Sequence, residues 1–179
     1  MIFQKTSLHG AFLIEPERKE DDRGFFARTW CRQEFTERGL DAELTQCNIS
    51  FNKREGTLRG MHYQRAPHGE SKLVRCTMGA IYDVLVDMRP ESPTFKNWFA
   101  AELSSENRLS LYIPEGIAHG FQTLTDKSEV FYQMSHEHHP ECAVGFRWND
   151  PLIGIRWPRS ISVISERDRE WPDLGDGRK

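Results

Sequence analysis

The sequence has few cysteines, no long apolar run and no excess of basic residues. Its four cysteines are scattered and form no C-x-x-C pair, so reduced thiols in a cytoplasmic protein are the simplest expectation. No uninterrupted apolar stretch approaches the length of a membrane span. The first residues also lack the apolar core and cleavage site of a signal peptide. We therefore expect a cytoplasmic localisation and no membrane partner.

Charge and length narrow the class further. The formal net charge is −3, whereas a general nucleic-acid surface needs a basic excess, so no nucleic-acid partner is expected. Apolar residues make up 37% and charged residues 28% of the chain, a balance typical of a globular protein. The length of 179 residues suits a single domain over residues 1–179.

Most of the chain predicts short β-strands separated by turn residues. The clearest strand covers residues 80–88, where apolar residues alternate with two aspartates between Gly79 and Arg89-Pro90. Residues 109–113 and 129–134 are further candidates, and helical signals are confined to residues 31–38 and 165–170. This pattern predicts an all-β sandwich or barrel with a few short helices.

Two glycine-flanked segments carry the candidate chemistry. GTLRGMHYQ, over residues 56–64, contains Arg59 and His62, and IPEGIAHGF, over residues 113–121, contains His119 before Gly120. Two such histidines also occur in metal sites built on an H-x-H pair and a glutamate. Here the second position of the pair is Gln64 and the glutamate position is Lys72, which would repel a divalent ion. We therefore expect no metal and no cofactor.

A lysine near a histidine suits the chemistry of an enolate. Removing a proton next to a ketone places negative charge on the carbonyl oxygen, which a fixed cation stabilises. Histidine is the side chain whose charge changes near neutral pH, as a base for this step must. Inverting the carbon also requires an acid on the opposite face, and a tyrosine hydroxyl can serve.

Several ordered blocks of sequence carry a family resemblance. They are DDRGFF, QCNIS, GTLRGMHYQ, KLVRCTMGAIYDVLVDMRPESPTF, IPEGIAHGF, EVFYQ, RWNDP and ISERD. With these blocks the sequence resembles the dTDP-4-dehydrorhamnose 3,5-epimerases over nearly its whole length. The resemblance implies a metal-free cupin jelly roll, a double-stranded β-helix. It also implies a homodimer in which an N-terminal strand crosses to the partner.

The resemblance further implies an isomerase and its site residues. The reaction would invert C3 and/or C5 of a nucleotide-linked 4-keto-6-deoxy sugar, taking dTDP-4-keto-6-deoxyglucose to dTDP-4-keto-L-rhamnose. His62 would be the base, Asp168 its orienting carboxylate, Lys72 the enolate stabiliser and Tyr132 the acid. The implied substrate ligands are Arg23 and Arg59 at the diphosphate, Phe26, Gln46 and Asn48 in the nucleotide or sugar pocket, and His119 at the sugar.

Each of these residues also has a simpler interpretation. Arg23 could cap a turn after two aspartates, Tyr132 could be a packed aromatic residue, and Asp168 could be a helix-start carboxylate. The histidine run at positions 136, 138 and 139 could hold a metal, but next to Pro140 it is expected to be solvated surface.

Two positions depart from the family pattern at the nucleotide end of the expected pocket. Ala27 and Arg28 stand where an aromatic residue and a glutamate are usual, and His138 stands where a tyrosine is usual. Cytosine N3 accepts a hydrogen bond whereas thymine N3–H donates one, so Arg28 could mark an enzyme for a CDP-linked sugar. Alternatively, Arg28 points to solvent and thymidine is bound by other groups.

Other functions also fit parts of the sequence. The alternatives within this chemistry are a mono-epimerase of C3 or C5 only on a CDP- or other NDP-linked sugar, and a keto-sugar isomerase. A non-catalytic sugar-binding cupin would be expected to lack part of the catalytic set, which is complete here. A metal-dependent oxygenase is disfavoured by Gln64 and Lys72.

Overall fold

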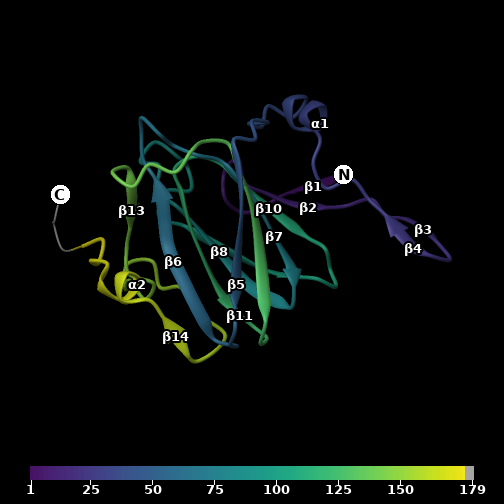
Figure 1. Cartoon of the computed structure of the whole chain (residues 1–179). Coiled ribbons are helices and arrows are strands. Elements are labelled where there is room, and N and C mark those ends of the chain that lie inside the picture. Colours follow the sequence, from purple (N-terminus) through teal and green to yellow (C-terminus); the bar gives the residue numbers. More distant parts are fainter. Residues whose placement is uncertain (176–179) are drawn as a thin grey trace.

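Two antiparallel sheets face each other in the computed structural model, which describes residues 1–175 (Figure 1). The first sheet has the order β1 (Ile2–Lys5), β2 (Phe12–Glu15), β10 (Ser110–Ile113), β7 (Lys72–Met78), β12 (Ser128–Met134) and β5 (Gln46–Asn52). The second has the order β13 (Ala143–Gly145), β6 (Thr57–Gln64), β11 (Ile117–Thr123), β8 (Ala80–Asp87) and β9 (Trp98–Ser104), and β14 (Val163–Ile164) pairs with β6 in parallel. This arrangement confirms the predicted all-β jelly roll.

The main apolar core fills the space between the sheets. Val74 on β7 and Val130 on β12 meet Leu85 on β8 and Phe121 on β11, all with essentially no exposed surface. The outer faces are covered as well. The first sheet packs on the N-terminal segment around Phe35, and the second packs on the segment around Phe146. Strands of both sheets are therefore buried on both faces along much of their length.

The predicted strands and helices form within one or two residues of their expected limits. Strand β8 is predicted almost to the residue, and its two apolar faces enter different cores. The helices are shorter than expected: α1 covers Arg32–Thr36 and α2 covers Glu166–Glu170. Cys31 has an extended backbone and so precedes α1, while the Ser165 hydroxyl caps α2 by accepting from the Asp168 N–H at 3.1 Å.

A hairpin of β3 (Lys19–Asp21) and β4 (Gly24–Phe26) stands apart from the two sheets. It projects from the body of the molecule, at the right of Figure 1. Its tip carries Arg23, and Phe26 near its end is 75% exposed. No helix among residues 1–175 is long and apolar enough to cross a membrane.

Candidate active site

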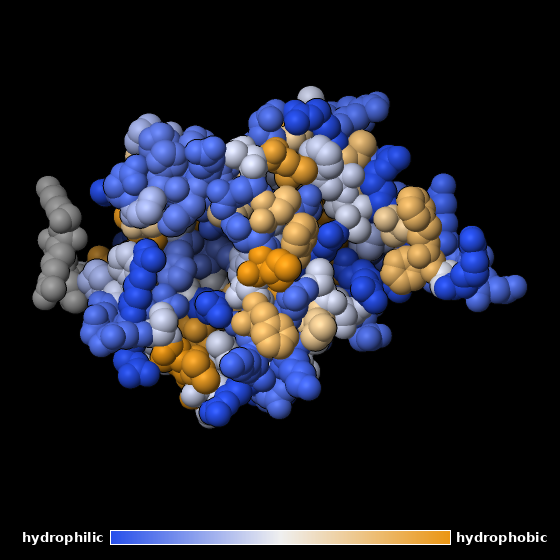
Figure 2. Space-filling view, in the orientation of Figure 1, coloured by the Kyte–Doolittle hydropathy of each residue, from blue (hydrophilic) through white to orange (hydrophobic). Residues whose placement is uncertain are grey.

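A cavity of about 310 Å³ opens between β5 and β6 at one end of the two sheets, where Figure 2 shows a hollow. Five strands and the start of α2 contribute to its wall. The lining residues are Asn48, Ile49, Ser50, Arg59, His62, Lys72, His119, Gly120, Phe121, Tyr132, Met134 and Asp168. The cavity therefore brings together seven of the twelve site residues expected from the sequence.

Two glycines place the cavity's histidines side by side. Strands β6 and β11 pair with His62 opposite His119, and the register shifts just beyond them. Gly60 and Gly120 lie in contact across this pair: a Cβ on Gly60 would be 2.5 Å from the Gly120 Cα. A Cβ on Gly120 would be 2.6 Å from the Met61 sulfur and 2.8 Å from the Arg59 carbonyl oxygen. Only glycine permits this approach.

His62 forms a short hydrogen bond with Asp168. Its Nε2 lies 2.5 Å from the Asp168 Oδ1, and the carboxylate is nearly buried while the imidazole is 38% exposed to the cavity. Burial tends to raise the pKa of Asp168, but hydrogen bonds from His62, Ser165 and the Gly60 N–H offset it and leave that pKa below its ordinary value. The ionised carboxylate holds a proton on Nε2 and leaves the other ring nitrogen as an acceptor.

His119 forms a second histidine–aspartate pair deeper in the cavity. Its Nε2 lies 2.9 Å from both carboxylate oxygens of Asp83, and neither side chain reaches solvent to any extent. Burial raises the pKa of Asp83, although His119 and Lys72 act in the opposite direction. Asp83 was not among the expected site residues. The available signal was a carboxylate within a strand that is apolar on both faces, since such a charge needs a partner.

Lys72 is held at the edge of the cavity by a second unexpected carboxylate. Its Nζ lies 3.0 Å from the Glu70 Oε1, with the two side chains 11% and 3% exposed. The positive charge of Lys72 also acts to lower the pKa of Asp83. The ammonium group is thus nearly desolvated, and the low dielectric around it strengthens its electrostatic effect inside the cavity.

Tyr132 lies on β12 and contacts His119 edge to face, with ring centroids 6.0 Å apart. Burial, together with the negative charge of Asp83, raises the pKa of Tyr132 well above its ordinary value. The phenol therefore stays protonated across the physiological range and can act as a hydrogen-bond donor or an acid.

A cation and amides occupy the outer part of the cavity. The Arg59 Nε donates to the buried Asn52 Oδ1 at 2.8 Å, which fixes the guanidinium beside the opening. Asn48 donates to the Met134 sulfur at 3.2 Å, and Gln46 extends the same strand to the rim. The Gln46 Oε1 accepts from the His138 N–H at 3.2 Å, so these two residues lie beside the cavity rather than in its wall.

Three expected substrate ligands lie away from this chain's own cavity. Arg23 forms an ion pair with Asp21 at 2.6 Å on the projecting hairpin, where Phe26 is also exposed. Arg28 pairs with Glu34 of α1 at 3.0 Å and is 62% exposed. Arg23 also donates its backbone N–H to the Asp21 carboxylate in the turn, and the cavity described above holds only part of the expected ligand set.

Comparisons with known proteins agree on one family. The family model described as dTDP-4-dehydrorhamnose 3,5-epimerase matches residues 5–176. The dTDP-4-dehydrorhamnose 3,5-epimerase of Methanothermobacter thermautotrophicus is 47% identical over 96% of this chain and 94% of its own length. The crystal structure of the enzyme from Elizabethkingia anophelis NUHP1 superposes with a TM-score of 0.95 at 36% identity, covering 99% of this chain and 98% of that one.

A relative with a narrower activity is also similar. The crystal structure of a 3'-monoepimerase from Streptomyces bikiniensis, in complex with dTDP-quinovose, has a TM-score of 0.87 at 34% identity and covers 94% of this chain and 86% of that one. These matches confirm the resemblance found in the sequence, with its cupin-type fold and its class of isomerase. The chain belongs to the dTDP-4-dehydrorhamnose 3,5-epimerase family.

Proposed function

We propose that the protein inverts C3 and C5 of dTDP-4-keto-6-deoxyglucose to give dTDP-4-keto-L-rhamnose. The observation that carries this proposal is the His62–Asp168 pair, which shares one cavity with Lys72 and Tyr132 in a chain of this family. A base, a cation and a protonated phenol around one small space are the three groups that inversion next to a ketone requires.

The reaction at each carbon runs in two proton transfers. The free ring nitrogen of His62 takes the proton on the carbon next to the ketone, and the C–H electron pair moves into an enolate. Tyr132 then donates its hydroxyl proton to that carbon from the opposite face, which inverts the configuration. The tyrosinate recovers a proton from solvent as the imidazolium releases one. The raised pKa of Tyr132 keeps the phenol fully protonated before the transfer.

Lys72 and the His119–Asp83 pair stabilise the intermediate. The enolate oxygen carries the negative charge that develops, and the nearly buried Lys72 ammonium lies at the cavity to receive it. His119 lies beside Tyr132, with one ring nitrogen held by Asp83, so its orientation toward the sugar is fixed. These residues need no metal or cofactor for the proposed steps.

The nucleotide is proposed to be dTDP. The relatives compared above are named for dTDP-linked sugars, and the one factor that favoured CDP was Arg28. That guanidinium is paired with Glu34 outside the cavity, so it is not held toward a base in this chain. Arg59 at the opening is proposed to bind the diphosphate, and Asn48, which also lines the cavity, is proposed to bind the adjoining nucleotide or sugar.

We also propose a cytoplasmic homodimer in which each hairpin completes the partner's cavity. Arg23 and Phe26 project from the body of one chain, where they can reach a neighbour. Figure 2 shows apolar surface over β5 and over the hairpin, where Ile49, Phe51 and Phe25 are exposed. Strand β5 is also an edge strand, open to pairing or packing by a second copy. Free thiols at all four cysteines fit a reducing compartment.

Product stereochemistry tests the proposed function. The protein is incubated with dTDP-4-keto-6-deoxyglucose, the mixture is reduced with borohydride, and the sugars are released and identified by NMR. Sugars inverted at both C3 and C5 support the proposal, and a single inverted carbon would assign a mono-epimerase instead. Unchanged configuration with the dTDP sugar but inversion of its CDP-linked counterpart would overturn the nucleotide assignment.

A further inference from the structure

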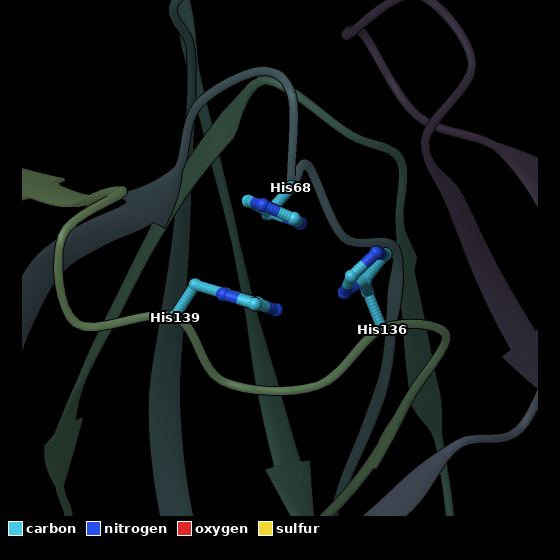
Figure 3. Close-up of side chains that lie close together, drawn as sticks. All are labelled: His68, His136 and His139. Atoms are coloured by element: carbon cyan, nitrogen blue, oxygen red, sulfur yellow. The ribbon is translucent and has the colours of Figure 1, made fainter.

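A cluster of three histidines lies outside the catalytic cavity. His68 comes from the segment between β6 and β7, and His136 and His139 come from the segment between β12 and β13 (Figure 3). The His68 and His139 rings stack with centroids 3.6 Å apart and planes 9° apart, and the His136 ring lies 5.1 Å from His68 and 5.4 Å from His139. All three side chains are half-buried, so His136 and His139 are not the solvated surface expected from the sequence, whereas His138 is exposed as expected.

A buried glutamine fixes the two segments against each other. Gln64, which is 2% exposed, donates from Nε2 to the carbonyl oxygens of His68 and Glu137 at 3.0 and 3.1 Å. Its Oε1 accepts from the His139 N–H at 2.5 Å. One side chain therefore holds the backbone of both segments, and the histidines start from fixed positions. Such preorganisation lowers the entropy cost of binding a shared ligand.

The three imidazoles each keep a nitrogen available. The His139 Nδ1 contacts the Glu141 carboxylate at 3.0 Å and the His136 Nδ1 contacts the Glu137 carbonyl oxygen at 3.3 Å. The Nε2 atom of each of these rings has no hydrogen-bond partner in the part of the chain that the structure describes. The His68 Nδ1 is buried and has no hydrogen-bond partner within residues 1–175. A buried nitrogen without a partner carries an energetic cost that a bound cation would remove.

We propose that His68, His136 and His139 form a peripheral site for a transition-metal ion, with Zn²⁺ as its ligand. One nitrogen from each residue lies within 4.8 Å of the other two. Nitrogens on a tetrahedral zinc lie roughly 3.3 Å apart, since each Zn–N bond is about 2.0–2.1 Å. Binding would close this difference by rotating the side chains and by tilting the stacked His68 and His139 rings apart, since their planes are now only 9° apart.

The surroundings match zinc better than a hard cation. Neutral imidazole suits Zn²⁺, Cu²⁺ or Ni²⁺, whereas Ca²⁺ and Mg²⁺ prefer oxygen ligands. Glu141 against the His139 Nδ1 is the carboxylate–histidine arrangement that orients a metal-bound imidazole. Glu141 and the buried Cys142 also lie near His68 as a second possible donor set, so His68 is common to both arrangements.

Bound zinc would stabilise the rim of the catalytic cavity. The segment that carries His68 leads through Glu70 to Lys72, and the segment that carries His136 follows Met134 of the cavity wall. The ion would thus link two parts of the chain that are distant in sequence. A ligand that binds the folded chain but not the unfolded chain raises the thermal stability of the protein.

Zinc titration of an untagged chain tests the site. Isothermal titration calorimetry with ZnCl₂ is expected to give one ion per chain, and thermal unfolding is expected to shift to higher temperature with zinc and return with EDTA. His68→Ala is expected to weaken zinc affinity by more than about tenfold and to abolish the shift. His138→Ala is the matched control, because His138 is an exposed histidine of the same segment outside the cluster.

The outcomes separate this site from the alternatives. Equal zinc affinity in His68→Ala and the wild type would overturn the proposal, as would an absence of zinc binding. Loss of zinc in His62→Ala but not in His68→Ala would place the ion in the catalytic cavity and also overturn it. If His68→Ala fails to fold, His136→Ala provides the same test. The zinc affinity of either variant is compared with that of the wild type only if the EDTA-treated variant unfolds at the wild-type temperature.

Discussion

At the scale of single residues, the candidate site depends on which groups hold or give up a proton. The Asp168 carboxylate and the Tyr132 phenol are both buried, but their surroundings lower the pKa of Asp168 and raise the pKa of Tyr132. Contacts with residues distant in sequence cause these pKa shifts. The role of each side chain can therefore be tested by a substitution that removes the titratable group but keeps the shape of the side chain.

Replacing Asp168 with Asn is expected to lower turnover at least about 100-fold. The amide cannot supply the charge that holds a proton on the His62 Nε2 and stabilises the imidazolium. Steady-state kinetics with the dTDP-linked substrate measures the effect. Glu166→Gln, two residues earlier on α2, is the control and keeps full turnover, since Glu166 does not line the cavity. Full activity in Asp168→Asn would contradict the role proposed for this carboxylate.

The same carboxylate predicts a pH dependence of stability. The folded pKa of Asp168 lies below its ordinary value of 3.8, so its ionised form contributes stability above that pH. This contribution is lost as the pH falls through the folded pKa. Chemical denaturation from about pH 6 to about pH 2, which covers the ordinary value and the region below it, should show a steeper loss of stability with acid in the wild type than in Asp168→Asn. Parallel profiles would contradict the assignment.

Replacing Tyr132 with Phe is expected to separate proton removal from inversion. His62 can still take the proton, but no acid remains on the opposite face, so inverted product falls by about 10²–10⁴-fold. NMR in D₂O would show deuterium entering the substrate with its configuration retained. Tyr82→Phe is the matched control, because Tyr82 packs on Trp157 outside the cavity. Unchanged inversion in Tyr132→Phe would show that another group is the acid.

At the scale of elements, the contact between β6 and β11 decides where both histidines lie. The pairing of His62 with His119 requires the close approach of Gly60 and Gly120, and the strands continue on either side of it. A single methyl group in this contact therefore tests how tightly the site is built.

Gly120→Ala is expected to destabilise the protein by about 1–3 kcal/mol, because the new Cβ overlaps the Met61 sulfur and the Arg59 carbonyl oxygen. Urea denaturation measures the loss, and activity is expected to fall with it because both histidines are displaced. Gly175→Ala is the control, since its added Cβ approaches nothing closer than Leu152 at 3.5 Å. Equal stability of Gly120→Ala and the wild type would contradict this account of the strand pair.

Local sequence predicted the elements better than their contacts. Alternation and turn residues located β8, β10 and β12 to within about a residue, because each pattern belongs to one short segment. The Asp83–His119 pair and the contact of Gln64 with Glu137 could not be predicted this way, since the two members of each are separated by tens of residues. The catalytic roles came from family resemblance rather than from pattern, and they stay predictions until the variants are measured.

At the scale of the whole molecule, the site residues divide into two groups. The proton-transfer residues share the cavity of one chain, while Arg23 and Phe26 stand on a hairpin that projects away from it. The sequence resemblance implied that an N-terminal strand crosses to a partner, and the exposed hairpin is the element that we propose for this crossing.

Mixing two inactive variants tests whether each site is shared. Arg23→Ala and His62→Ala are each expected to be inactive, but a hybrid dimer would hold one intact site. Random exchange of equal amounts should restore about a quarter of wild-type sites. Activity measured after unfolding and refolding the mixture, with each variant alone as the control, gives the result. No recovery in a mixture shown to contain hybrid dimers would mean that each chain builds its own site.

The most direct test of the central claim is deuterium exchange followed by NMR. The substrate dTDP-4-keto-6-deoxyglucose is incubated in D₂O with the wild type and with His62→Ala. We expect the wild type to introduce deuterium at both C3 and C5. With His62→Ala, exchange at either carbon is expected to be no faster than exchange without enzyme. Exchange at both carbons by a folded His62→Ala protein would contradict the claim that this histidine is the base.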